Sequence, residues 1–76
     1  MALYNDVINV AKNYLGIAAK EYIERRCRIA FKIELQELTE EHLERLADTI
    51  ELTATAYISE EKVKKFKNEI LELKNQ

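Results

Sequence analysis

Hydrophobic and polar positions follow the same order twice in the C-terminal half of the chain, at an offset of 20 residues. Residues 38–50 read LTEEHLERLADTI, and residues 58–70 read ISEEKVKKFKNEI. In both segments, apolar residues recur at spacings of three and four, which is typical of one apolar stripe on an α-helix. The repeat therefore predicts two consecutive amphipathic helices, at about residues 40–53 and 60–74, which would form a helical hairpin.

Both segments begin with the same helix-start signal. Thr39 and Ser59 are candidate N-caps, because a hydroxyl at that position accepts a hydrogen bond from a backbone N–H that the helix leaves unpaired. An apolar residue precedes each cap and another follows it four residues later, which is the spacing of a hydrophobic staple. A full capping box also needs an acidic or amide residue three positions after the cap, where His42 and Lys62 stand instead. The caps are therefore predicted without the box.

The N-terminal third is much more apolar than the rest, since Asp6 and Lys12 are the only charged residues before residue 20. On a helix, its apolar residues cover an arc of roughly 200°, whereas packing on a single partner needs only somewhat more than ~100°. The hairpin can cover one side of this arc, and a second copy of the chain is the expected cover for the other. The alternative is that the arc lies between the two C-terminal helices of its own chain. The predicted oligomer interface is Leu3, Tyr4, Val7, Ile8, Ala11, Tyr14, Leu15, Ala18 and Tyr22.

Residues 20–37 are compatible with two structures. A single helix from about residue 3 to residue 34 is favoured by the stabilising i,i+4 pairs Glu21–Arg25 and Glu24–Arg28. It is also favoured by the lack of a turn residue in this part of the sequence. The expected fold class is therefore all-α, with a long N-terminal helix followed by the helical hairpin.

The alternative is an α+β fold with a short strand at residues 27–35. Apolar residues alternate strictly with polar or small ones there, which is the period-two pattern of a half-buried strand. A lone strand needs a partner. That partner would be the same strand across a dimer, or the stretch at residues 53–58.

Composition bounds the architecture. The 76 residues make a single small helical domain (residues 1–76), and zero proline with one glycine favours long helices. A core of this size supplies only about 3–5 kcal/mol without a further support. The single Cys27 cannot form an intramolecular disulfide, so oligomerisation is the expected support. No apolar run is long enough to cross a membrane, and a lone thiol suits a reducing compartment, so a cytoplasmic location is expected.

No group of residues indicates catalysis, a cofactor or a metal site, and we expect the protein not to be an enzyme. His42 lacks the preceding glutamate of a Glu-x-x-His metal motif. Cys27 lies among arginines that would lower the pKa of an exposed thiol, but its place in the apolar alternation favours a small buried side chain.

Basic residues supply the one functional lead. On a helix, Arg25, Arg28 and Lys32 would form a stripe with Arg26 beside it, and lysines also gather at the start of the last predicted helix. Acidic residues at helical spacing accompany these clusters, as expected for solvated faces with local ion pairs. We therefore expect a non-enzymatic protein–protein interaction or adaptor module that acts as a homo-oligomer. The alternative is a small DNA- or RNA-binding regulator that uses Arg25, Arg26, Arg28 and Lys32.

Overall fold

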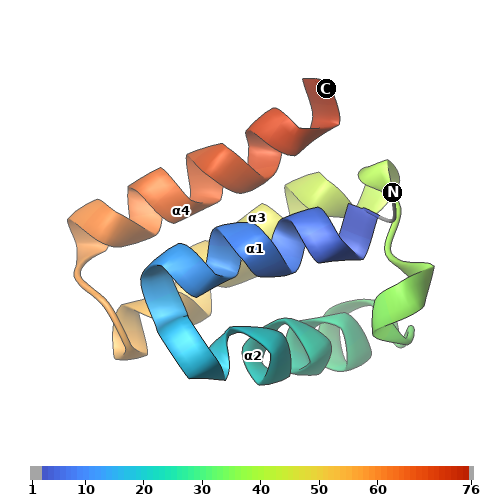
Figure 1. Cartoon of the computed structure of the whole chain (residues 1–76), viewed down its shortest axis with the longest axis horizontal. Helices are drawn as coiled ribbons and strands as arrows, with labels where there is room; N and C mark the ends of the chain where they lie inside the picture. Colours follow the sequence, from blue (N-terminus) through green and yellow to red (C-terminus); the bar gives the residue numbers. More distant parts are fainter. Residues whose placement is uncertain (1–2, 76) are drawn as a thin grey trace.

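Four α-helices fold back on one another in the computed structural model, which describes residues 3–75. The helices are α1 (Leu3–Leu15), α2 (Ala19–Arg26), α3 (Leu43–Thr53) and α4 (Glu60–Glu72). Figure 1 shows α1 at the centre, with α2 below it, α4 above it and α3 behind it. Each helix runs opposite to the one before it. The all-α class is confirmed, and no strand occurs within residues 3–75.

The single long helix predicted over residues 3–34 is wrong, because the chain turns back at Gly16. Gly16 has a φ of +59°, in the left-handed region that glycine adopts without a steric penalty. A short 3₁₀ turn, Gly16–Ala18, begins at this residue, and α2 then returns along α1. The prediction treated this glycine as an ordinary helical residue, whereas it is the corner between two helices.

The strand considered for residues 27–35 is also wrong. Residues Cys27–Phe31 form a π-helical turn that continues α2. Lys32, with a φ of 57°, ends this turn by taking the left-handed conformation that commonly terminates helices. The apolar alternation does not define one buried face, since Cys27 is buried while Ile29 is exposed. A helical turn therefore explains the segment better than a pleated one.

The two helices of the predicted hairpin are confirmed, with small differences at their ends. α3 is preceded by a 3₁₀ turn (Glu40–His42), and α4 continues into another (Leu73–Asn75). Ser59 caps α4 as expected, since its hydroxyl accepts a hydrogen bond from the Lys62 backbone N–H at 3.4 Å. Their apolar stripes are buried as expected, through the residues Leu43, Leu46, Ile50, Val63, Phe66, Ile70 and Leu73.

His42 takes the place of the missing acidic residue at the start of α3. The Thr39 backbone N–H donates a hydrogen bond to Nδ1 of His42 at 3.0 Å, which is the reciprocal half of a capping box. The imidazole also packs on the Phe31 ring, with 4.7 Å between the ring centroids. One side chain therefore joins the start of α3 to the turn that ends α2.

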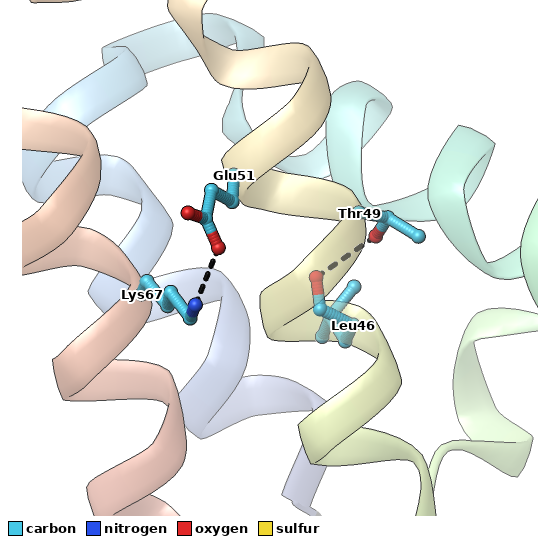
Figure 2. Close-up of polar contacts among 4 residues, drawn as sticks. All are labelled: Leu46, Thr49, Glu51 and Lys67. Carbon is cyan, nitrogen blue, oxygen red and sulfur yellow. Dashed lines mark hydrogen bonds and ion pairs between the residues drawn. The ribbon is translucent and has the colours of Figure 1, made fainter. Parts of the chain in front are cut away.

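Polar contacts of α3 include one to a neighbouring helix and one within α3 itself. Figure 2 shows the ion pair between Lys67 of α4 and Glu51 of α3, together with the hydrogen bond from the Thr49 hydroxyl to the Leu46 carbonyl. The Lys67 ammonium holds the pKa of the Glu51 carboxyl below its usual range, and Glu51 raises the pKa of Lys67. The pair is exposed, so it orients the two helices more than it stabilises them.

Replacing Gly16 with alanine distinguishes a corner at this residue from a continuous helix, because the two structures predict opposite changes in the free energy of unfolding. A Cβ at Gly16 meets no neighbouring atom within 4 Å, but its φ of +59° strains any L residue. We therefore expect Gly16→Ala to lower the free energy of unfolding by about 1 kcal/mol. In a continuous helix the same change would raise it by a similar amount, about 1 kcal/mol.

Urea denaturation followed by circular dichroism measures this difference. Gly16→Asn is the matched control, because asparagine tolerates the left-handed region better than alanine, so it should lose less stability. A Gly16→Ala variant more stable than the parent protein would contradict the corner.

Candidate functional site

Large hydrophobic side chains that remain exposed gather around α2. Among the described residues they are Ile17, Ile29, Leu52 and Tyr57, with exposed fractions of 103%, 66%, 80% and 62%. Ile17 lies just before α2 and Ile29 in the turn that continues it, while Leu52 and Tyr57 come from the end of α3 and the segment after it. We call this surface, together with the charged residues Glu21, Glu24, Arg25 and Arg28, the α2 face.

A shallow hollow of about 230 Å³ lies on one side of α2. Tyr22 forms its floor and is held in place by three contacts. Its hydroxyl lies 2.5 Å from the Thr53 hydroxyl, the Tyr57 ring meets its ring edge-on at 5.8 Å, and the Arg26 guanidinium lies 5.4 Å from its ring centroid. Burial raises the pKa of Tyr22, against smaller opposing effects of the Thr53 hydrogen bond and Arg26. The hollow is therefore lined by two aromatic rings, of which Tyr22 is fixed by several contacts.

A second hollow, of about 190 Å³, lies between the end of α2 and the outer side of α3. Ile29 and Leu52 line it with Ala30, and Arg26 borders both hollows. The Nε of Arg26 is buried and has no hydrogen-bond partner among residues 3–75. An unpaired buried donor costs about 1–3 kcal/mol.

The predicted basic stripe is not continuous in the structure. Arg26 lies over Tyr22, and Arg28 makes an exposed ion pair with Glu34 at 3.6 Å. Lys32 is itself the left-handed residue that ends the helical turn, so it does not continue the stripe of Arg25 and Arg28. Only Arg25 and Arg28 share the outward side of α2, where Glu21 and Glu24 accompany them around one hollow. The surface is mixed in charge and not uniformly basic.

Most of the residues predicted for an oligomer interface lie inside a single subunit. Val7, Ile8, Ala11 and Tyr22 are buried, because α2 and α4 pack on opposite sides of α1. Four others are half-buried and pack against the core of their own chain, namely Leu3, Tyr4, Tyr14 and Leu15. Of the nine predicted interface residues, Ala18 alone is exposed, at the edge of the α2 face. The apolar arc is therefore covered by the chain itself, with α2 supplying the cover that the sequence prediction assigned to a second copy.

Two residues considered for chemistry occupy structural positions. His42 caps α3, and Cys27 is fully buried beneath α2. Burial, with a smaller effect from Glu24, raises the pKa of the Cys27 thiol to about 11, opposite to the lowering that exposed arginines would cause. Within residues 3–75, no three histidine, cysteine or acidic side chains lie close enough together to hold a metal ion.

None of the helices described is long and apolar enough to cross a bilayer. In the comparisons with known proteins, no protein-family model, curated protein or solved structure matches the chain.

The burial of Cys27 predicts that its thiol is protected as long as the chain is folded. A rise in pKa from 9.0 to about 11 leaves about 100-fold less thiolate near neutral pH, and burial blocks access as well. We expect iodoacetamide to alkylate Cys27 at least about 100-fold more slowly in the native protein than in guanidinium. Mass spectrometry over a time course measures both rates, and similar rates in the two conditions would contradict the buried position.

Proposed function

We propose that this protein is a non-enzymatic protein–protein interaction module that acts as a homo-oligomer and uses the α2 face as its contact surface. The observation that carries the proposal is the gathering of exposed large hydrophobic side chains beside one short helix. Large apolar side chains clustered on a surface and rimmed by polar residues are typical of interaction sites. The hollow lined by Tyr22 and Tyr57 adds the aromatic side chains in which such sites are enriched.

The proposed interface is on α2, whereas the sequence predicted it on α1, but the reason for self-association is the same. A chain of 76 residues has a small core, and oligomerisation is a common way to supplement it. Burying one exposed leucine or isoleucine contributes about 1.5–3 kcal/mol, part of which is lost to the entropy of association. The proposal includes a cytoplasmic location, because a reducing compartment keeps a lone cysteine such as Cys27 free.

An aspartate at Leu52 tests the contact surface. Leu52 is 80% exposed, so Leu52→Asp should leave the fold intact and weaken self-association at least about tenfold. Sedimentation velocity over a concentration series measures association, and circular dichroism checks the fold. Asn68→Asp is the matched control, since it adds the same single charge on α4, across the molecule from α2 (Figure 1).

Two results would contradict the proposal. One is a protein that stays at its monomer mass of 8.9 kDa at every concentration. The other is self-association that Leu52→Asp and Asn68→Asp change equally.

The alternative, a nucleic-acid-binding regulator, receives less support from the geometry. Glu21 and Glu24 lie beside Arg25 and Arg28, so a phosphate backbone approaching α2 would meet both signs of charge. We expect labelled single- and double-stranded oligonucleotides to show no anisotropy change with this protein at low salt. Binding that weakens steeply as salt rises, and that Arg25→Ala reduces, would favour the regulator instead.

A further inference from the structure

The charged side chains on the outward side of α2 follow a fixed order along the chain. Glu21 and Glu24 precede Arg25 and Arg28 along α2 and the turn that continues it. These four side chains and Ile29 line one shallow hollow of about 250 Å³, so they face the same region of solvent. At 1.5 Å per residue, the charged stretch is about 10 Å long. Among the four charged side chains that line this hollow, the acidic pair therefore comes first along the chain and the basic pair second.

This division makes the surface complementary to itself in one orientation. Two α2 helices packed antiparallel about a twofold axis between residues 24 and 25 place Glu21 beside Arg28 of the other copy. The same operation places Glu24 beside Arg25, and the twofold axis repeats both pairs. A parallel arrangement in register would place like charges together, which is destabilising.

The positions of the exposed isoleucines also fit antiparallel pairing of two α2 helices. Ile17 lies at the start of α2 and Ile29 beyond its end, with exposed fractions of 103% and 66%. Antiparallel pairing brings the start of one helix to the end of the other, so Ile17 and Ile29 would come within about one helical turn of each other. Leu52 lines the same hollow as Ile29 and widens the apolar contact. Apolar contacts would then flank the charged pairs on both sides.

We infer that the partner of the α2 face is a second copy of this chain, paired antiparallel through α2 about a twofold axis between residues 24 and 25. The inference rests on the proposed function and adds to it the occupant and the orientation. Arg28 changes partner on pairing, from Glu34 of its own chain to Glu21 of the other copy. The Arg28–Glu34 pair leaves both side chains 64% exposed, so it leaves Arg28 accessible for this exchange.

Charge reversal tests the orientation. The variant E21R/E24R makes the α2 face basic throughout, and R25E/R28E makes it acidic throughout. Each variant alone should self-associate at least about tenfold more weakly than the parent protein, because like charges then meet across the axis. An equimolar mixture of the two should form a heterodimer with an affinity within about threefold of the parent.

The variant E21R/R28E supplies the matched control. It exchanges the two end charges within one chain, so the antiparallel pairs keep their opposite signs and the dimer should persist. A different protein with fixed charges, in contrast, would no longer fit this variant. Circular dichroism of all variants checks that α2 still forms, and sedimentation velocity with one fluorescent component measures pairing in the mixture.

The outcomes separate the inference from the proposed function. If Leu52→Asp weakens self-association while the charge variants associate like the parent, the α2 face is the interface but the antiparallel pairing is wrong. A mixture that fails to associate, or an E21R/R28E variant that no longer pairs, also overturns the inference. A parent protein that stays monomeric at every concentration overturns both.

Discussion

The left-handed backbone at Gly16 is the constraint on which the rest of the structure depends. It ends α1 after 13 residues and returns the chain as α2, so that α1 becomes the central helix. Val7 and Ala11 are then fully buried within one subunit, and Tyr14 stacks on Phe66 of α4 with 5.1 Å between the ring centroids. A continuous helix would instead have carried α2 beyond the hairpin, leaving one side of the wide apolar arc of α1 without cover from its own chain.

The same corner determines which surface is left for contact with other molecules. α2 covers α1 with one side, through Ala19, Tyr22 and Ile23, and turns the other side to solvent. The π turn that follows buries Cys27 but leaves Ile29 outside. The N-terminal helix therefore belongs mostly to the core, whereas one side of α2 stays on the surface.

Sequence reasoning predicted the helices whose signals are local. The N-cap at Ser59 and the apolar stripe from Val63 to Ile70 lie within one segment, and the structure has both. Gly16 was missed because an isolated glycine in a helical pattern is often tolerated, and its backbone angle depends on packing far along the chain. His42 was missed as a capping-box residue because its ring nitrogen takes a role usually given to glutamate. The exposed residues of the α2 face could not be predicted from a helical or a strand repeat, because the π turn moves Ile29 away from the buried stripe.

The distance between the start of α1 and the end of α2 tests the corner at Gly16 most directly. Spin labels at Asn5 and Arg28, in a Cys27→Ala background diluted with unlabelled protein, report that distance by pulsed electron paramagnetic resonance. The start of α1 and the turn that continues α2 lie toward the same end of the molecule (Figure 1), so the structure predicts a distance well inside its longest dimension of 29 Å. A distribution centred near 35 Å, the span of 23 residues at about 1.5 Å each in a continuous helix, would contradict it.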